Sequence, residues 1–397
     1  MEVRKIRQDE MVRVVLLQNI VFLAGADADY KARLAEPLAH SGGWERAWGV
    51  FDEGGRLVSS LEVHDYALRF DGNETVVGGI AGVGTLPENR NAGCVRMLFE
   101  AVFRKMRERG AAYSLLYPFS FNFYRKFGYE LCYSANMINF SIDQMERVSF
   151  PDGIEAYEPG ADLAPYKSVY EAFAKGKNLS VARDGQNWDK LINHDPYLTR
   201  RCAYLHRKKC GSPDAYVVYH PERAGSDFLL RVLELAYLDQ EGLHAMIGFM
   251  RGQGAKFSRA EFEAPSFFDP CVFFPESRKI VREFRSVGML RIIEPVAALS
   301  LLRAPEGEGS VKIRVRDAFC PENTGTYKVE WEGGRLAARR QTKGADISLD
   351  IETLAQLTSG YLSAAQASLK KGVLIEGNAG AIERLFPQKE TYLQERF

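Results

Sequence analysis

The sequence has little that would hold a metal ion or a disulfide framework. Its 6 cysteines stand apart without a Cys-x-x-Cys pair, and its 6 histidines do not cluster beside them at metal-ligand spacing. It also lacks an excess of charge, because 52 basic residues balance 52 acidic ones. These absences argue against a metal site and against a general electrostatic attraction to nucleic acid or to a membrane surface.

Long apolar runs are missing too. The first five residues, MEVRK, lack the apolar core of a signal peptide, and no uninterrupted apolar run approaches the roughly 20 residues that cross a bilayer. We therefore expect a soluble, cytoplasmic protein. At 397 residues the chain is long enough for two or three domains, each with its own hydrophobic core.

The most informative stretch covers residues 76–129. It opens on a run of β-branched residues and glycines, 76–85, which predicts a strand that a ligand or another backbone can approach closely. After a turn at 86–93, apolar residues recur at helical spacing, which predicts an amphipathic helix that ends at Gly110. The apolar positions of this helix are Val95, Leu98, Phe99, Val102, Phe103 and Met106.

The start of this helix has the features of a phosphate site. Free N–H groups of a first helical turn, the positive end of the helix dipole and the nearby Arg90 suit a pyrophosphate, and Gly93 lets the phosphate approach. A plain helix start is the alternative. A second predicted strand at 112–117 leads into a short helix that carries Tyr124 and is capped by Gly128.

A strand followed by Arg90-Asn91-Ala92-Gly93 and a helix resembles the coenzyme A signature of the GNAT acetyltransferases. Residues 124–129, Tyr-Arg-Lys-Phe-Gly-Tyr, resemble the YxxFGY segment of their Eis-like branch. The resemblance implies acetyl coenzyme A as the cofactor and Tyr124 as the proton donor. It implies cofactor contacts at Val83, Thr85, Arg90, Asn91, Gly93 and Cys94. Since Asn91 and Ala92 stand where the branch often has arginines, cofactor affinity is expected to depend more on backbone amides.

Other reactive side chains have simpler explanations. Cys94 lies in the cofactor turn, but no histidine is near it in sequence, so a backbone contact is favoured over a nucleophilic thiol. His64 is interpreted as a satisfied core or surface histidine. Asp27, Asp29 and Glu36 lie where Eis-like proteins border the acceptor pocket, and they either attract a cationic amine or are solvated surface carboxylates.

Three domains are predicted in an α/β chain with α+β mixed sheets. Residues 1–150 form a GNAT domain with the coenzyme A site. Residues 151–288 repeat its pattern, but their turn at 239–242 is too short and too acidic for a pyrophosphate, so this degenerate GNAT-like domain is predicted to bind no cofactor. Residues 289–397 resemble the sterol-carrier-protein-like domain that ends Eis-type chains.

The last residue, Phe397, is bulky and apolar. A frayed end is the usual explanation for such a tail. In the Eis-like family, however, the terminus enters the first domain and presents its α-carboxylate to the acceptor amine, so the resemblance implies a catalytic role for Phe397. It also implies a homo-oligomer, which is a hexamer in that family.

The favoured function is acetyl transfer from acetyl coenzyme A to a primary amine of a small acceptor that is amine-bearing or polycationic, like an aminoglycoside or a polyamine. No nucleic-acid or membrane partner is expected. Two alternatives remain: a protein that binds a lipid or another small molecule through its last domain, and an enzyme that acetylates protein lysines.

Overall fold

The computed structural model describes residues 1–22, 43–145, 148–193, 195–225, 227–272, 274, 278 and 280–395. Its contacts divide the chain into two compact units. The first unit holds Met1–Cys132 and Gly288–Gln388, and the second holds Tyr133–Val287 and the tail from Lys389. The chain leaves the first unit within strand β6 (Glu130–Ser141) and returns within β12 (Val281–Ile292). The predicted three-domain boundaries, after residues 150 and 288, stay a prediction.

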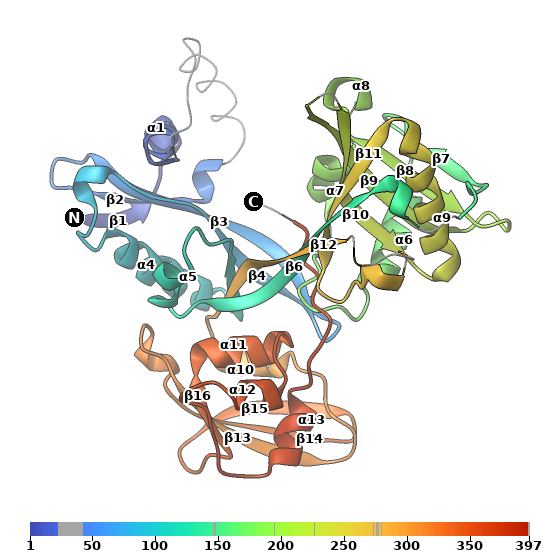
Figure 1. Cartoon of the computed structure of the whole chain (residues 1–397). Coiled ribbons are helices and arrows are strands. Elements are labelled where there is room, and N and C mark those ends of the chain that lie inside the picture. Colours follow the sequence, from blue (N-terminus) through green and yellow to red (C-terminus); the bar gives the residue numbers. More distant parts are fainter. Residues whose placement is uncertain are drawn as a thin grey trace. The chain divides into compact units, whose positions relative to one another are not determined.

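The first unit contains a sheet with helices on both faces (Figure 1). Its strands are, in spatial order, β1 (Glu2–Lys5), β2 (Ala47–Phe51), β3 (Leu57–Phe70), β4 (Asn73–Thr85), β5 (Tyr113–Leu116) and β12. Helix α1 (Met11–Phe22) packs on one face, while α4 (Cys94–Glu108) and α5 (Phe121–Arg125) share a core on the other. Strands β4 and β5 run parallel, because α4 forms the crossover between them.

Local sequence signals explain these elements. The apolar positions predicted for α4 are confirmed, since all but the half-buried Val95 are buried. The chain leaves this helix through Gly110, whose φ of +74° is the left-handed conformation that glycine tolerates. The sequence Asp71-Gly72-Asn73 predicts a hairpin turn, and the structure confirms it: β3 and β4 pair on either side of Asp71 and Gly72, which both have a positive φ.

The second unit repeats this pattern, as the sequence predicts. Its strands are, in spatial order, β6, β11 (Phe257–Pro265), β10 (Asp227–Tyr237), β9 (Pro213–Ala224), β8 (Cys202–Arg207) and β7 (Ile154–Ala156). Its helices are α6 (Ala164–Ala174), α7 (Gly185–Leu191), α8 (Pro196–Thr199) and α9 (Gln240–Gly252). Strands β10 and β11 are parallel and are joined through α9, which corresponds to the order β4, α4 and β5 in the first unit.

The chain between β12 and the tail builds a five-stranded sheet with short helices. The strand order is β15 (Arg335–Gln341), β14 (Gly325–Glu332), β13 (Gly309–Arg316), β16 (Ile347–Asp350) and β17 (Leu374–Ile375). The helices are α10 (Pro295–Ser300), α11 (Ile351–Ser359), α12 (Ala364–Ala367) and α13 (Ala379–Leu385). The residue pattern predicts strands at 310–316, 325–331, 335–340 and 346–350 and helices at 295–302 and 380–386, and the observed elements agree with it.

Two strand predictions differ in extent or pairing from the structure. The residue pattern predicts two separate strands at 130–133 and 137–140, but these are one continuous β6, because the residues between them pair with β11, as Asn136 does with Ala264. The pattern also predicts a strand at 290–293 at the start of the last domain; residues 290–292 are in β12, which pairs with β5 from Met289 opposite Leu116 to Ile292 opposite Tyr113. Both differences come from pairings with distant segments, which local patterns do not report.

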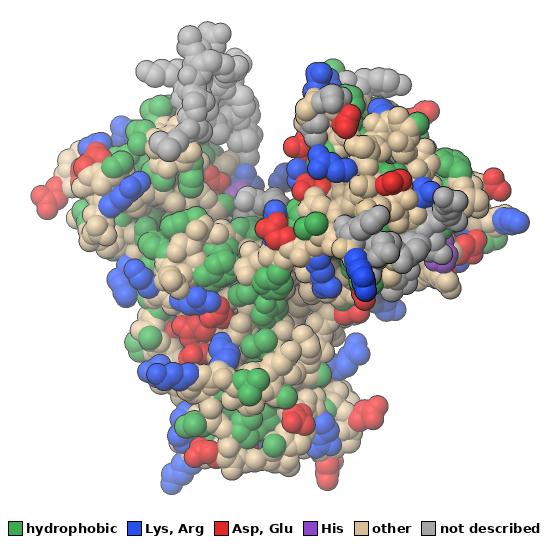
Figure 2. Space-filling model, in the orientation of Figure 1, with side chains coloured by type: hydrophobic (Ala, Val, Ile, Leu, Met, Phe, Trp, Pro, Cys, Tyr) green, Lys and Arg blue, Asp and Glu red, His purple; other side chains and the backbone are tan. Residues whose placement is uncertain are grey.

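The surface carries charges of both signs. Figure 2 shows basic and acidic side chains interspersed over the face that it presents, as the formal net charge of zero leads one to expect. In the described part of the chain, no helix has the length and apolar character needed to cross a membrane.

Candidate active site

The end of β4 has an open edge and a bulge. Strand β4 pairs with β5 only from Gly78 to Ile80 but continues to Thr85, so its last residues extend beyond this pairing. On the other side, the register with β3 shifts so that Gly82 and Val83 together oppose one residue of β3. Such a bulge twists the strand and redirects its backbone groups, and bulges recur beside active sites. Val83 and Thr85, the predicted cofactor contacts on this strand, therefore lie where β4 separates from β5.

The turn after β4 leads directly into α4. A short 3-10 helix, η3 (Pro87–Asn89), precedes three exposed predicted residues: Arg90, Asn91 and Gly93. Asn91 and Gly93 have φ values of 65° and 78°. The first-turn amides of an α-helix have no intrahelical acceptor, and they meet the positive end of the helix dipole. The structure thus brings the predicted turn residues to a site of the kind that binds phosphate.

Cys94 begins α4 but turns its thiol inward. Its exposed fraction is 2%, and its Sγ lies 4.0 Å from the carbonyl oxygen of Asn89. Burial raises the pKa of the Cys94 thiol above its ordinary value. A buried thiol held in its protonated form is a poor nucleophile, so this geometry agrees with a contact through the backbone alone.

We expect Arg90→Ala and Gly93→Glu to weaken coenzyme A binding, the second more severely. Arg90 supplies one exposed positive charge, whereas Glu at 93 would place a side chain and a negative charge against the phosphate site. Isothermal titration calorimetry with coenzyme A measures both effects.

Gly93→Ala is the matched control for this experiment. A Cβ at position 93 meets no atom within 4 Å, so alanine adds the strain of a positive φ without charge or a clash. Unchanged cofactor affinity in Arg90→Ala and Gly93→Glu would move the phosphate site elsewhere.

Tyr124 lies in a buried aromatic cluster beneath α4. Ser120 caps the start of helix α5, because its hydroxyl accepts the Phe123 N–H at 3.4 Å. The helix places the Tyr124 ring edge-on to the rings of Phe119 and Phe123, at centroid distances of 5.4 and 5.1 Å. The side chain is only 4% exposed, and burial raises the pKa of its hydroxyl above the ordinary value. The phenol therefore keeps its proton at neutral pH, as a proton donor must.

The structure gives a steric reason why position 128, in the YxxFGY segment, is a glycine. Its φ is +78°, and a Cβ there would lie 1.9 Å from Nη1 of Arg291, a fully buried residue of β12. Arg291 pairs with the buried carboxylate of Asp317, which also accepts the Cys320 N–H at 2.9 Å. A buried ion pair whose carboxylate has further hydrogen bonds holds its segments in one geometry, because breaking it leaves a charge uncompensated. The pair thus connects the segment after β13 to the C-terminal end of α5, the helix that carries Tyr124.

The partly buried carboxyl group of Glu352 predicts an effect of pH on stability. Burial, with the nearby Asp350, raises the pKa of Glu352 in α11 to about 7. Because the folded state keeps this proton to a higher pH than the unfolded state, stability is lost as the pH rises from about 4.3 through 7. We expect Glu352→Gln to stabilise the protein at pH 8, by about 1–3 kcal/mol, and by roughly a third of that at pH 5.

Thermal unfolding of wild type and variant at both pH values checks this. Glu383→Gln, which replaces an exposed carboxylate of α13, is the control and should give the same small shift at pH 5 and pH 8. An equal effect of Glu352→Gln at the two pH values would contradict the raised pKa.

Sequence reasoning missed a polar cluster beside the bulge. Glu62 of β3 accepts the Gln18 Nε2–H at 3.2 Å, and its other oxygen lies 3.0 Å from Nε2 of His64. The sequence alone gives His64 no role, but the structure shows it joined to a carboxylate. The sequence could have indicated this pair, because Glu62 and His64 are two residues apart on a predicted strand and therefore lie on the same face of it.

The corresponding helix start in the second unit is occupied by the protein itself. Asp239 caps α9 by accepting the Gly242 N–H at 3.1 Å, and Lys208 forms an ion pair with the same carboxylate. The Lys208 side chain and the Gly242 amide hold the pKa of Asp239 below its ordinary value, so the cap is negatively charged. A resident carboxylate at the first turn disfavours a phosphate there, which gives the physical reason for the prediction that this domain binds no cofactor.

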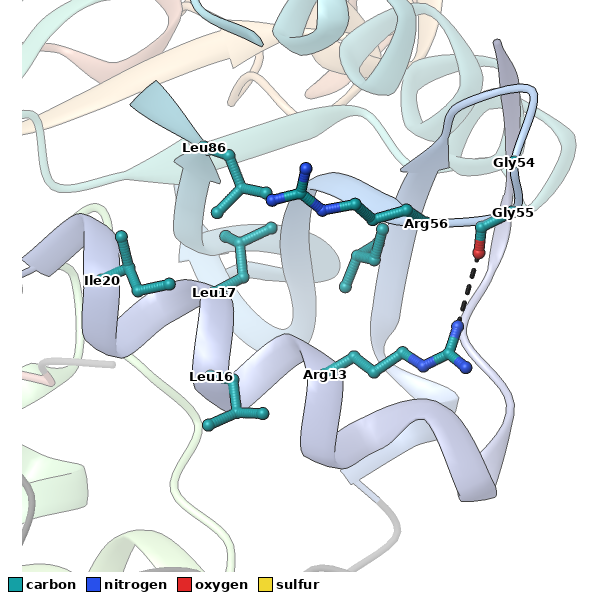
Figure 3. Close-up of a pocket in the computed structure, with 9 residues that line it drawn as sticks. Arg13, Leu16, Leu17, Ile20, Gly54, Gly55, Arg56 and Leu86 are labelled. Carbon is teal, nitrogen blue, oxygen red and sulfur yellow. Dashed lines mark hydrogen bonds between the residues drawn. The ribbon is translucent and has the colours of Figure 1, made fainter. Parts of the chain in front are cut away.

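A hollow of about 450 Å³ lies between α1 and the turn that joins β2 to β3 (Figure 3). Arg13 donates to the carbonyl oxygen of Gly55 at its rim, and Arg56 reaches across it to Glu88 at 2.7 Å. Leu16, Leu17 and Ile20 of α1 form its apolar side. None of the predicted site residues lines this hollow, although Leu86, the first residue of the turn that leads to α4, does.

Some predicted residues lie outside the part of the chain that the structure describes. These are Phe397 and the three acidic residues Asp27, Asp29 and Glu36. In the described ranges, no group of three or more His, Cys, Asp or Glu side chains is arranged to hold a metal ion.

The tail before Phe397 is held by the second unit. Tyr392 is buried and donates its hydroxyl to Glu234 at 3.0 Å, and its N–H donates to the carbonyl oxygen of Asn178 at 2.9 Å. Arg183 forms buried ion pairs with both Glu234 and Glu395. Because these groups are paired with one another in the interior, the tail is fixed as far as Glu395.

Comparison with known proteins agrees with this architecture in domain order. Residues 2–132 match an acetyltransferase (GNAT) domain family, residues 179–292 match a second acetyltransferase (GNAT) domain family, and residues 295–394 match the sterol carrier protein domain family. The N-acetyltransferase Eis of Mycobacterium tuberculosis is 24% identical over 329 residues, which cover 77% of each chain. The chain is an Eis-like GNAT acetyltransferase.

Two further known proteins match a larger share of this acetyltransferase than Eis does. An uncharacterized N-acetyltransferase of Streptomyces coelicolor is 24% identical over 362 residues, which cover 85% of each chain. The crystal structure of a GCN5-related N-acetyltransferase from Anabaena variabilis superposes with a TM-score of 0.86 at 20% identity, and it covers 100% of both chains. The predicted fold class, two GNAT folds followed by a sterol-carrier-like domain, is confirmed.

Proposed function

We propose that this acetyltransferase transfers the acetyl group of acetyl coenzyme A to a primary amine of a small polycationic acceptor, such as a polyamine or an aminoglycoside. The observation that carries the proposal is the end of β4, where an open, bulged strand runs through an exposed turn into the start of α4. An extended pantetheine chain suits such an edge, and a pyrophosphate suits the helix start. When bound, acetyl coenzyme A supplies an activated thioester.

The residues of the chain then have defined tasks. Arg90 and the amides near Gly93 and Cys94 hold the phosphates, and the backbone of Val83 and Thr85 lies along the cofactor. Amides of the strand polarise the thioester oxygen as negative charge develops on it. Tyr124 donates its phenolic proton to the leaving sulfur, which the raised pKa of a buried phenol allows at neutral pH.

The amine must lose a proton before it attacks, since an alkylammonium group has a pKa of about 10. We propose that the α-carboxylate of Phe397 accepts this proton. The support for this assignment is the resemblance to the Eis-like family, in which the chain terminus presents its α-carboxylate to the acceptor amine.

One hollow of the terminal domain is poorly suited to a lipid. The hollow found against β13, β14 and β15 is open and lined by charged side chains, including Glu308, Glu330, Arg335 and Arg384. An apolar ligand gains little from such a surface. We therefore favour acetyl transfer over lipid binding as the function.

A screen of acetyl coenzyme A consumption tests the proposal. Spermidine and other polyamines, aminoglycosides such as kanamycin, amino acids and protein extracts are each supplied in turn. We expect turnover with small polycationic amines and little labelling of protein. Labelling of protein lysines without turnover of free amines would favour the protein acetyltransferase instead, and no turnover with any acceptor would overturn the proposal.

We further propose that the chain assembles as a closed homo-oligomer, a hexamer by the family resemblance. Light scattering at micromolar protein should then give a mass well above the 44.7 kDa of one chain. A monomer mass would contradict this.

A further inference from the structure

We propose that Glu62 binds the ammonium group of the acceptor and that Gln18 and His64 hold its carboxylate in position. The inference rests on the acetyl transfer proposed above, and it adds the residue that selects a cationic acceptor. Three features of the first unit carry it: the face on which Glu62 lies, its distance from the bulge in β4, and its charge.

Glu62 points to the face of the sheet opposite α4. Its neighbours on β3, Leu61 and Val63, belong to the core that includes α4 and α5. Side chains alternate along a strand, so Glu62 and His64 point to the other face, where Gln18 of α1 donates to Glu62. The cofactor phosphates are assigned to the start of α4. An acceptor at Glu62 would thus approach from the opposite side of the sheet.

The Glu62 carboxylate also stands close to the bulge. Glu62 is opposite Ala81 in the register of β3 and β4, immediately before Gly82 and Val83. Nε2 of Gln18, which donates to Glu62 Oε1 at 3.2 Å, lies 2.5 Å from the position that a Cβ at Gly82 would occupy. Gln18 therefore joins the carboxylate to the part of β4 that extends beyond its pairing with β5, where the thioester is proposed to lie.

The carboxylate is charged and can be reached. Burial alone would raise the pKa of Glu62, but the hydrogen bonds from His64 and Gln18, with the charge of Arg46, lower it below its ordinary value. The side chains of Glu62 and His64 are 18% and 21% exposed, so solvent reaches both. A carboxylate has about four acceptor positions, and the bonds to Gln18 and His64 occupy one on each oxygen. An ammonium group with three N–H donors suits the positions that remain.

The test compares Glu62→Gln with wild type, using spermidine and kanamycin as acceptors. Glutamine keeps the shape and one acceptor oxygen but removes the charge. We expect KM for the amine to rise 10- to 100-fold, because a hydrogen bond to a charged group is lost, while kcat and the affinity for coenzyme A change little. The matched control is Asp65→Asn, which neutralises an exposed carboxylate three residues along β3 that is bonded to Arg109 and should leave KM unchanged.

The role of His64 is tested separately. His64→Gln keeps an N–H donor for Glu62 and should retain most of the affinity for the amine, whereas His64→Leu should raise KM without lowering the melting temperature in proportion. Rescue by the donor-bearing variant would support positioning over general packing.

Each outcome bears on a definite claim. If the wild type acetylates either probe and Glu62→Gln has the wild-type KM, the inference is wrong while the proposed function stands. If Glu62→Gln loses kcat together with the basic group in the pH profile, Glu62 is a proton acceptor and the binding role is wrong. If the wild type acetylates neither probe, the proposed acceptor class fails, and the inference fails with it.

Discussion

Replacing Tyr124 by phenylalanine is expected to lower kcat by roughly 10²- to 10⁴-fold while the fold and the affinity for coenzyme A are kept. Only the donated proton is removed, because a phenylalanine ring at this position would fill the same buried space among Phe99, Phe119 and Phe123. Steady-state kinetics with a fixed amine acceptor, together with calorimetry for coenzyme A, separate the loss in rate from a loss in binding.

The matched control is Tyr129→Phe. Tyr129 is fully buried in the same aromatic cluster, with its ring 6.2 Å from that of Tyr124, but its hydroxyl is bonded to Ser114 at 2.7 Å. Loss of that bond should reduce the melting temperature more than it reduces kcat, because a buried hydrogen bond is removed, while the Ser114 hydroxyl keeps its bond to the Gly78 carbonyl oxygen at 2.7 Å. If Tyr124→Phe turns over at the wild-type rate, Tyr124 is a packing residue and not the proton donor.

Moving or blocking the α-carboxylate of Phe397 is expected to abolish most transfer and to leave coenzyme A binding intact. Deletion of Phe397 shifts the carboxylate about 3.5 Å back along the chain, and a C-terminal tag removes it from that position. A terminal carboxylate has a reference pKa of roughly 3.3–3.7, and removal from water beside apolar rings would raise this pKa toward values that suit a proton acceptor. Single-turnover assays at several pH values measure the loss.

The two side-chain competitors for this role are the controls. Glu88 is exposed and bonded to Arg56 at 2.7 Å, and Glu395 is held by Arg183. Glu88→Gln and Glu395→Gln each keep an oxygen that can accept the arginine N–H, so both should retain substantial activity. A fully active C-terminally tagged enzyme would rule the terminal base out.

The site was predictable where it depends on consecutive residues. The order of strand, turn, helix, strand and short helix between residues 76 and 129 appears in the structure as β4, η3, α4, β5 and α5. The glycines at 93, 110 and 128 all have the positive φ that their positions in the turn and at the helix ends suggest. Hydrophobic periodicity and cap residues act over a few positions, so one sequence reports them directly.

The site was not predictable where it depends on residues far apart in the chain. Gln18 and Glu62 are separated by 44 residues, and Arg291 and Asp317 by 26. Sequence patterns mark Glu62 and His64 only as polar positions on a strand. Their meeting with Gln18 beside the bulge arises from the packing of α1 on the sheet.

By itself, the sequence of this protein determined the strand, turn and helix pattern and its repeat, the turn at Arg90 to Gly93 and the short helix that carries Tyr124, because local spacing sets each of them. The acetyltransferase and sterol-carrier-like assignments came from the resemblance of these motifs, in their order along the chain, to a known family. Only the tertiary structure decided that β12 completes the first sheet, that Asp239 and Lys208 occupy the second helix start, and that Tyr392 and Glu395 fix the tail. The physical reason is that ion pairs and strand pairings act through space, and a pairing between distant residues has no periodic signal along the chain.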